Sequence, residues 1–271
     1  MPEAPDLEAI RAFLAPRICG APIASAEVRV PIVARFSKEA LAAELRGACV
    51  QAIERRGKFL LFGLSTGRML VINPMLTGRF QYVSPAERPQ AKTCAVVTFA
   101  HGCQLRYVDA NLMGKLYLVD EAGLGAVPQF AEMGPDVLDP ALTEAVFCAR
   151  LRRHPGMLKN VLTNQAFVAG IGNAYADEIL FVAGLHPHRR RSQLSAAEQQ
   201  GLFRAVGAVM SWALPIVAAQ MQAGLSYDEW RAHLRVHGKG GQPCPACGGP
   251  ISEITAGKRT TNYCRRCQPR F

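Results

Sequence analysis

Two Cys-x-x-Cys pairs near the end of the chain constrain its fold more than any other sequence feature. Cys244 and Cys247 form the first pair, Cys264 and Cys267 form the second, and 16 residues separate the pairs. This spacing is typical of a four-thiolate zinc site on two knuckles of a hairpin. Two disulfide bonds are the alternative. However, the chain has nine cysteines, and an odd number with adjacent Cys-x-x-Cys pairs favours a metal in a reducing compartment. We therefore expect one structural Zn²⁺.

The metal must contribute much of the folding energy of this segment. A segment of about 30 residues cannot bury a hydrophobic core of its own, so metal binding and folding are coupled there. The loop between the two cysteine pairs carries Lys258 and Arg259. The zinc site therefore organises a basic loop.

Positive charge is concentrated in the second half of the chain. Residues 1–150 carry 16 Lys/Arg and 15 Asp/Glu, a net charge of +1, whereas residues 151–271 carry 15 and 6, a net charge of +9, which together give +10. Such an asymmetry predicts a polyanionic partner, nucleic acid first of all, with a merely solvated basic face as the alternative. The longest apolar window, 205–221, is interrupted by Ser211, Pro215 and Gln220, so no membrane span is expected.

The first 130 residues predict a β-sandwich or barrel. Short runs of β-branched and aromatic residues alternate there with turn signals such as Ser65-Thr66-Gly67. Before them, apolar residues from Leu7 to Ile18 recur at helical spacing and predict one helix against the sheet. The strands are expected at 28–36, 58–64, 68–72, 93–100, 104–108 and 116–119.

The pattern changes to a helical period after a linker near Pro135-Asp136. Helices are expected at 141–151, 156–162, 173–182 and 195–221, which indicates a small helical module after the sheet module. A Gly/Pro-rich stretch at 238–243 then leads into the cysteine segment.

A glycine-rich turn, Gly170-Ile171-Gly172-Asn173, precedes one of these helices. In a dinucleotide-binding loop the third glycine would fall on Tyr175, and no clear βαβ unit surrounds the turn, so that interpretation fits poorly. A tight turn capped by Asn173 fits better, and exposed N–H groups at such a helix start bind phosphate well. An ordinary connection between helices, without a ligand, remains the alternative.

The chain starts with Met1-Pro2-Glu3. Removal of Met1, which its small neighbour permits, would leave Pro2 with a secondary α-amine. The pKa of an α-amine, about 8, is well below the value of about 10.4 for lysine, so part of it is unprotonated at neutral pH. Such an amine attacks an aldehyde-like carbon and forms an iminium ion, and Glu3 could protonate a sugar ring oxygen. Alone, this start also arises by chance.

Taken together, the motifs resemble those of the formamidopyrimidine-DNA glycosylase and endonuclease VIII family of base-excision repair enzymes. The resemblance covers nearly the whole chain, with the motifs in the same order. The matching segments are 1–5, 55–60, 164–180 with its Gly-Ile-Gly-Asn turn, and 240–267 with Lys258 and Arg259.

The resemblance implies an α+β, multi-domain fold. An N-terminal helix and a two-layer β-sandwich would form a catalytic domain in residues 1–133, a helix-two-turns-helix DNA-binding module would follow in 134–232, and a β-hairpin zinc finger in 233–271. The implied protein is a bifunctional DNA glycosylase and abasic-site lyase. Its partner would be double-stranded DNA with a damaged base or an abasic site. We expect a monomer in the cytoplasm, associated with the nucleoid and without a membrane.

The resemblance also implies residue roles. Pro2 would form a Schiff base with deoxyribose C1′ as the base leaves, and Glu3 would act on the sugar as an acid, before β- and δ-elimination cut the strand. Lys58 would hold a phosphate and assist catalysis, although an arbitrary lysine there would be an ordinary surface residue. The other residues implied in DNA binding are Leu76, Met113, Lys159, Asn173 and Arg259, of which Arg259 would also serve catalysis.

Two departures from the family pattern bear on the substrate. Where the family commonly has Asp-Pro-Arg-Arg-Phe-Gly, this chain has Asp109-Ala-Asn-Leu-Met-Gly114, so the arginine that would pair with the orphaned base is replaced. Leu76, Leu112 and Met113 can still form an apolar wedge, but opposite-base discrimination should be relaxed. The segment 226–238 is also too short for the long loop that covers an everted oxidised purine. Oxidised pyrimidines, ring-opened purines or bulky adducts are therefore expected rather than 8-oxoguanine.

Two other functions remain as alternatives. One is a protein of the same fold that binds damaged or branched DNA without excising a base. The other is a zinc-ribbon protein that acts on RNA or in transcription. Borohydride trapping separates these classes, because only the lyase forms an iminium that reduces to a permanent crosslink.

Overall fold

The computed structural model describes residues 1–222, 224–225, 231–256 and 259–270. The chain divides into two compact units. Unit 1 consists of Met1–Ala131 and Leu214–Trp230, and unit 2 of Glu132–Ala213 and Arg231–Phe271.

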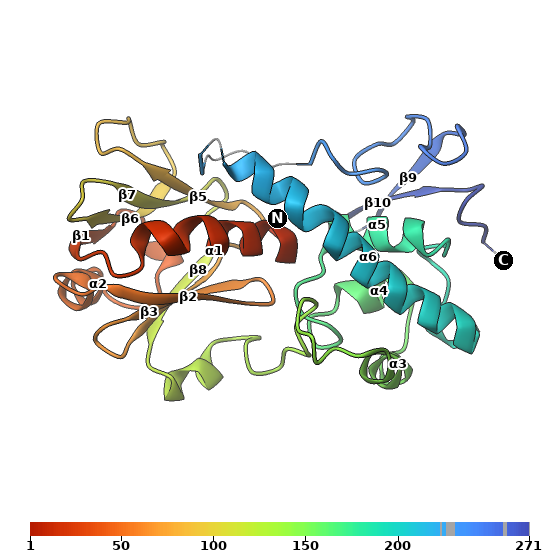
Figure 1. The fold of residues 1–271 in the computed structure, drawn as a ribbon, viewed down its shortest axis with the longest axis horizontal. Coiled ribbons are helices and arrows are strands. Elements are labelled where there is room, and N and C mark those ends of the chain that lie inside the picture. The colour runs from red at the N-terminus through yellow and green to blue at the C-terminus, as the bar shows by residue number, and fades with distance from the viewer. Residues whose placement is uncertain (223, 226–230, 257–258, 271) are drawn as a thin grey trace. The chain divides into compact units, whose positions relative to one another are not determined.

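Unit 1 is a sandwich of two antiparallel four-stranded sheets, as the sequence predicts (Figure 1). Helix α1 (Ala4–Ile18) packs on the second sheet and buries Leu7, Leu14 and Ile18 in the core between the sheets. The first sheet has the order β1 (Ile23–Val28), β6 (Thr93–Phe99), β7 (Gln104–Asp109), β5 (Gly78–Val83). The second has the order β2 (Val50–Arg56), β3 (Phe59–Leu64), β4 (Met69–Asn73), β8 (Lys115–Val119).

The predicted strand at 28–36 is wrong. Strand β1 ends at Val28, and a short 3-10 helix occupies Pro31–Val33. Proline has no N–H group to donate to a strand ladder, so the pairing stops before Pro31. Sequence patterning also missed β2, β5 and helix α2 (Lys38–Leu45). The other five strands lie where they were predicted, within one or two residues.

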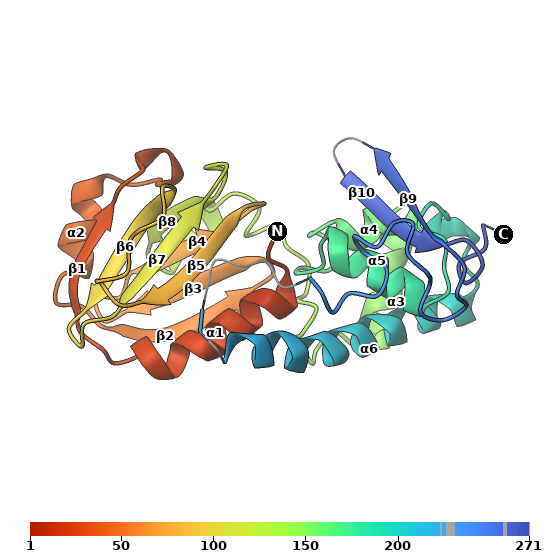
Figure 2. The ribbon, with the colours of Figure 1, turned by 90° about the horizontal axis from the view of Figure 1, so that it is seen from above.

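Unit 2 combines helices with a C-terminal hairpin. Helix α5 (Asn173–Val182) has the predicted bounds. Helices α3 (Glu144–Arg153), α4 (Leu158–Thr163) and α6 (Ala196–Met221) start one to three residues later than predicted. Thr143 caps α3, because its side chain accepts a hydrogen bond from Val146 N. The hairpin of β9 (Ile251–Ala256) and β10 (Arg259–Cys264) packs on α5, and both views show α4 and α5 between α3 and β10 (Figures 1 and 2).

Helix α6 is long and apolar enough, by length and composition alone, to cross a membrane. Its apolar side chains are, however, used inside the protein. Leu202, Val206 and Val209 are buried in unit 2, and Val217 and Met221 join the hydrophobic core of unit 1. Because core helices of folded proteins pass the same test, length and composition are weak evidence for a membrane span.

Candidate functional site

The start of α1 lies at the end of the sandwich where β2 turns into β3. Cys19, which follows α1, pairs with Val50 at the beginning of β2. Earlier in α1, Glu8 Oε2 accepts a hydrogen bond of 3.0 Å from Arg55 Nε near the end of β2. The helix therefore runs antiparallel to β2. Its first residues point toward the turn that carries Lys58.

The Glu8 carboxylate stays ionised at this junction. Burial raises its pKa, but the hydrogen bonds and charges of Arg11 and Arg55 outweigh burial and lower the pKa of Glu8 overall. The ion pair with Arg55 therefore persists at neutral pH, and it fixes α1 against β2.

Pro2 and Glu3 are held at the start of α1. Glu3 is the N-cap and forms a capping box with Asp6, in which Glu3 N donates to Asp6 Oδ2 at 2.8 Å. The Glu3 side chain is only 1% exposed, and Pro2 is also buried. While Met1 is present, the Pro2 nitrogen is an amide and has no nucleophilic lone pair. Removal of Met1 would convert it into an amine in a restrained position.

Lys58 lies in the two-residue turn between β2 and β3. Gly57, the other turn residue, has φ of +57°, a conformation that glycine adopts without strain. Arg55 Nη1 donates to Gly57 O at 3.1 Å and further restrains the turn. The Lys58 side chain is only 9% exposed. Its position next to the start of α1 is thus set by the fold.

Two loops open at this same end of the sandwich. Leu60, at the start of β3, pairs with Ile72 near the end of β4, and Asn73, the last residue of β4, pairs with Lys115, the first of β8. The loop 74–77 that leaves β4 and the loop 110–114 that enters β8 therefore lie at the end that carries the turn of Lys58. The structure brings Pro2, Glu3 and Lys58 to the same end of unit 1 as both loops.

Asp109 ties the two loops together. Its carboxylate accepts hydrogen bonds from Thr77 Oγ1, Asn111 N and Gly114 N, the last at 2.6 Å. Tyr107 Oη also donates to it at 3.3 Å. Burial and the Asp109 charge raise the pKa of Tyr107, so the hydroxyl keeps its proton. Asp109 is fully buried and fixes the shape of both loops.

The wedge residues expected on these loops differ in exposure. The side chains of Leu76 and Met113 are 47% and 37% exposed, which is unusual for large apolar residues. Leu112 instead packs against the hydrophobic core, with φ of +55°. A Cβ atom at Gly114 would lie 1.7 Å from Tyr107 Oη, so only glycine fits there. Two of the three expected wedge residues, Leu76 and Met113, are thus exposed and lie on the two loops that Asp109 ties together.

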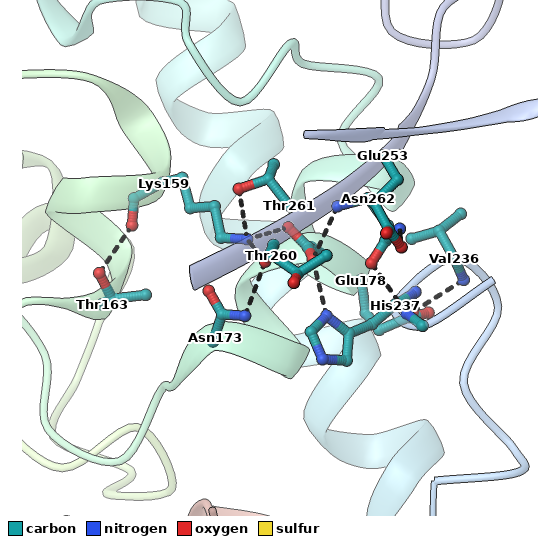
Figure 3. A network of polar contacts seen from close by, with 12 residues as sticks. Lys159, Thr163, Asn173, Glu178, Val236, His237, Glu253, Thr260, Thr261 and Asn262 are labelled. Atoms are coloured by element: carbon teal, nitrogen blue, oxygen red, sulfur yellow. Dashed lines mark hydrogen bonds and ion pairs between the residues drawn. The ribbon is translucent and has the colours of Figure 1, made fainter. Parts of the chain in front are cut away.

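In unit 2, Lys159 and Asn173 converge on β10, as Figure 3 shows. Asn173 Nδ2 donates to Thr260 O at 2.8 Å, and Lys159 Nζ donates to the same oxygen at 2.9 Å and to Thr261 Oγ1 at 2.9 Å. Arg259, the first residue of β10, is exposed beside them. Lys159 is only 7% exposed, so its ammonium acts inside unit 2. Its predicted contact with DNA stays a prediction.

The residue that caps α5 is not the expected Asn173. The helix begins at Asn173 itself, and Gly172 is the N-cap. The Asn173 side chain is used for the bond to Thr260 O, so it does not cap its own helix. The consequence is that Asn173 connects α5 with the residue next to Arg259.

Asp177 is the centre of a buried network that the sequence analysis missed. Its Oδ1 lies 2.7 Å from Lys159 Nζ, and its Oδ2 lies 2.8 Å from His237 Nδ1 and accepts from Asn262 N at 3.1 Å. Asp177 is one helical turn after Asn173, so both side chains leave the same face of α5. The four-residue spacing of Asn173 and Asp177 was the one sequence signal that could have pointed to Asp177. Two of its partners, His237 and Asn262, lie 60 and 85 residues away along the chain, beyond the reach of local patterns.

Glu178, the neighbouring residue, holds the segment that leads to the zinc hairpin. Its carboxylate accepts hydrogen bonds from the backbone N–H groups of Arg235, Val236 and His237 at 2.9–3.1 Å (Figure 3). Burial raises the pKa of Glu178, and these three donors oppose that effect. Two adjacent acids of α5 thus fix both β10 and the segment before the first cysteine pair.

We predict that Lys159→Met lowers the free energy of unfolding by about 3 kcal/mol. Removing one partner of a buried ion pair leaves the other charge without compensation, which typically costs 3–5 kcal/mol. Urea denaturation measures the change. Arg204→Met, which removes an exposed cation from α6, is the matched control and should change stability by less than about 0.5 kcal/mol. Equal effects of the two substitutions would contradict this assignment.

The four predicted metal ligands come together in unit 2. The sulfur atoms of Cys244, Cys247, Cys264 and Cys267 all lie within 4.8 Å of one another. The Sγ atoms of Cys244 and Cys267 are 3.8 Å apart, and those of Cys247 and Cys264 are 3.5 Å apart. Tetrahedral Zn–S bonds of about 2.3 Å imply S–S separations of about 3.8 Å. The donor set and geometry fit one Zn²⁺, and all four thiols are free of disulfides.

Two features of the sequence analysis fall partly outside the described residues. Lys258, between the cysteine pairs, is one of them. The segment 226–238, whose short length bears on the substrate, is described only from residue 231 onward.

Comparison with known families accounts for almost the whole chain. Residues 1–116 match the model of the formamidopyrimidine-DNA glycosylase N-terminal domain, residues 133–223 match that of the H2TH domain, and residues 241–270 match the zinc finger found in FPG and IleRS. The zinc finger and the four-cysteine cluster together assign one structural Zn²⁺ to this chain.

Full-length relatives agree with the domain matches. The formamidopyrimidine-DNA glycosylase of Symbiobacterium thermophilum is 38% identical over 279 aligned residues, which cover 99% of this chain and 90% of the relative. That of Geobacillus kaustophilus is 35% identical over 278 residues, with 99% and 100% covered.

Two solved structures with the same fold are complexes with DNA. Lactococcus lactis Fpg bound to DNA with an abasic site has a TM-score of 0.88 and 29% identity, and covers 98% of this chain and 99% of its own. The same enzyme bound to DNA with N7-benzyl-Fapy-dG has a TM-score of 0.89 and 30% identity, with 99% and 100% covered. The chain therefore belongs to the formamidopyrimidine-DNA glycosylase family of bifunctional DNA glycosylases and abasic-site lyases.

Proposed function

We propose that this protein excises damaged bases from DNA through a Schiff base on Pro2 and then cuts the strand by β- and δ-elimination. The observation that carries the proposal is the placement of Pro2 and Glu3 at the start of α1. This is the end of unit 1 that also carries Lys58 and the two loops linked by Asp109. The family relatives and the DNA-bound neighbours support this reaction.

The chemistry begins at the Pro2 nitrogen after Met1 has been removed. The amine lone pair attacks deoxyribose C1′, and the bond from C1′ to the base breaks, so the base leaves with the electron pair and takes up a proton. Glu3 protonates the ring oxygen as the sugar opens, and the Pro2 nitrogen loses its proton to form an iminium ion. A nucleophile that forms such an intermediate divides one difficult step into two easier ones.

Strand cleavage follows from the electron demand of the iminium. Loss of a C2′ proton places an electron pair that expels the 3′ phosphate in β-elimination. A second deprotonation expels the 5′ phosphate in δ-elimination. Hydrolysis of the iminium ion then returns the free Pro2 amine. Pro2 thus serves both the glycosylase and the lyase steps.

Phosphate contacts would hold the DNA around the extruded nucleotide. Lys58 is proposed to bind one phosphate beside Pro2, while Asn173 and Arg259 bind the flanking phosphates. Leu76 and Met113 would fill the gap that the flipped nucleotide leaves in the base stack. Lys159 and Asn173 both bind Thr260 O, so we assign Lys159 a positioning role for Arg259 in addition to its predicted role in DNA binding.

Oxidised pyrimidines, ring-opened purines or bulky adducts are the proposed lesions, rather than 8-oxoguanine. Asn111 and Leu112 stand where the family commonly has arginines, and Leu112 packs inward. The names of the relatives refer to formamidopyrimidine, a ring-opened purine. A solved neighbour holds DNA with N7-benzyl-Fapy-dG, a bulky example of that class.

We predict that base excision is at least about 10-fold slower for 8-oxoguanine than for a ring-opened guanine or an oxidised pyrimidine, as expected when about 1.4 kcal/mol of transition-state contacts is lost. Single-turnover cleavage of matched duplexes measures the rates. Comparable rates for 8-oxoguanine would contradict the lesion assignment.

We predict that the base opposite the lesion changes the excision rate by less than about 3-fold. Without the arginine that would hydrogen-bond the orphaned base, an apolar wedge distinguishes the four bases poorly. The same duplexes with each opposite base provide the measurement. A strong preference for one base would disprove relaxed discrimination.

Borohydride trapping on a duplex with an abasic site tests the whole proposal. Reduction of the iminium should give a stable protein–DNA crosslink with the full chain. Retention of the DNA without a crosslink would instead indicate a binding protein of the same fold. We propose further that the protein acts as a monomer in the cytoplasm, in association with the nucleoid, with the domains 1–133, 134–232 and 233–271.

A further inference from the structure

Two segments of unit 2 bring a set of arginines together away from β10. Arg152 and Arg153 end helix α3, and Arg190 lies next to the short 3-10 helix Arg191–Gln193. Arg191 Nη2 donates to Arg152 O at 2.8 Å and joins the two segments. Arg152, Arg153 and Arg190 are exposed, and we call these three residues the arginine surface.

No described residue neutralises the positive charge of the arginine surface through an ion pair. The nearby acid Glu198 is taken by Arg189, whose Nη2 donates to it at 3.1 Å. Asp177 and Glu178, the only acids between residues 150 and 195, are buried and bound elsewhere.

Stabilisation of the α3 end explains only part of this arrangement. Cations in the last turn of a helix interact favourably with its dipole, which accounts for Arg152 and Arg153. Arg191 satisfies a free carbonyl at that end. Arg190 is exposed, belongs to another segment and does neither. The described contacts therefore reveal no role in the fold for the exposed guanidinium of Arg190, whose segment Arg191 joins to the end of α3.

The arginine surface is separate from the residues around Arg259. In both views α4 and α5 lie between α3 and β10 (Figures 1 and 2). Lys159 and Asn173 are used at β10, whereas the arginine surface lies where α3 meets the 3-10 helix. A ligand held at β10 through Asn173 and Arg259 would not by itself occupy the arginine surface.

We propose that the arginine surface is a second contact site for the sugar–phosphate backbone of DNA, outside the segment that holds the lesion. Guanidinium groups bind phosphate oxygens through paired hydrogen bonds. Each neutralised phosphate releases counterions, so the contact adds affinity without sequence preference. The net charge of +9 in residues 151–271 favours a polyanion over an ordinary protein surface. The proposal rests on the DNA partner and not on the chemistry at Pro2.

The test uses the full, zinc-loaded protein with Arg152, Arg153 and Arg190 all changed to Gln. Arg191 is kept, so the bond that joins the two segments remains. The control variant changes three exposed arginines that lie apart from one another, Arg46, Arg88 and Arg204, to Gln. Both variants lose three positive charges, so only the position of the loss differs.

Equilibrium binding to undamaged duplexes of about 12 and about 40 base pairs is measured over a range of salt concentrations. With about 0.9 counterion released per phosphate, the slope of log affinity against log salt on the long duplex should fall in magnitude by up to about 2.7 in the surface variant. Affinity for the long duplex at low salt should fall at least about 10-fold, and for the short duplex less than about 3-fold. The control variant should keep a slope close to that of the wild type.

Equal slopes for the surface variant and the control variant on the long duplex would overturn the proposal, and an acidic protein partner would then be the better candidate for the surface. The salt dependence is measured without any covalent step. The slopes of the two variants could differ as predicted while the wild-type protein gives no borohydride crosslink. That result would disprove the proposed reaction and leave the second DNA contact intact.

Discussion

Replacing Pro2 with glutamine is expected to reduce the borohydride-trapped protein–DNA complex by at least about 1,000-fold, the scale seen when an enzyme loses its nucleophile. A large second residue keeps Met1 in place, so the nitrogen of residue 2 stays an amide. The first free amine is then displaced by one residue from the start of α1, where the capping box of Glu3 and Asp6 holds the backbone. Gel analysis after reduction on an abasic-site duplex measures the loss.

A second substitution distinguishes loss of the nucleophile from loss of the fold. Pro2→Gly still permits removal of Met1 and leaves a primary amine at the same position, so it should retain more crosslinking than Pro2→Gln. Both variants should keep their zinc, whose ligands lie in unit 2, and their affinity for undamaged DNA, because neither substitution changes a residue proposed to hold a phosphate. Full crosslinking by Pro2→Gln would show that another amine attacks the sugar.

Replacing Cys264 with serine is expected to remove most of the bound zinc and to weaken DNA binding at least about 100-fold. The apolar cluster around the hairpin is small, with Val236, Ile251 and two of the cysteines buried, whereas binding of a structural Zn²⁺ supplies about 10–16 kcal/mol. Without the metal, β10 loses its support and Arg259 its position. Metal analysis and equilibrium binding measure the two effects.

Cys148→Ser is the matched control for the zinc prediction. Cys148 lies on α3, outside the four-cysteine cluster, so this variant should keep one zinc and wild-type affinity. If the Cys264 variant loses its zinc but still binds DNA as tightly as the control, then the hairpin contributes nothing to DNA binding. The role assigned to Arg259 would then be wrong.

Local patterns predicted the elements of the fold better than their arrangement. Apolar residues located α1, which buries Leu7, Leu14 and Ile18, and α5, in which every residue from Ala174 to Leu180 is buried. The same patterning missed β2, because the register shifts between Val50 and Ala52 and the buried Val50 and Ile53 are three residues apart, which leaves no alternation in the sequence. It placed the first strand at 28–36, whereas β1 is Ile23–Val28 and Pro31 has no N–H group for a strand ladder. The order of the strands in the two sheets depends on pairings between distant segments, which no local pattern contains.

The same limit applies to the sites. Residue type and spacing identified the four cysteines, since metal ligands must have particular chemistry and separation. The chemistry of Pro2 and Glu3 was suggested by the first three residues, but their assignment, like that of Lys58, depended on the family resemblance, and the structure adds that all three lie at one end of the sandwich. Asp109 and Asp177 were missed, because a buried acid is recognised by its partners. Asp109 binds Thr77, which lies 32 residues away along the chain, and Asp177 binds His237, which lies 60 residues away.

Mass spectrometry of the borohydride-reduced crosslink tests the central claim most directly. After digestion of the protein and the DNA, the deoxyribose remnant should be found on the nitrogen of Pro2, at the start of a peptide that lacks Met1. A remnant on Lys58 or another lysine, or a crosslinked peptide that still contains Met1, would contradict the account.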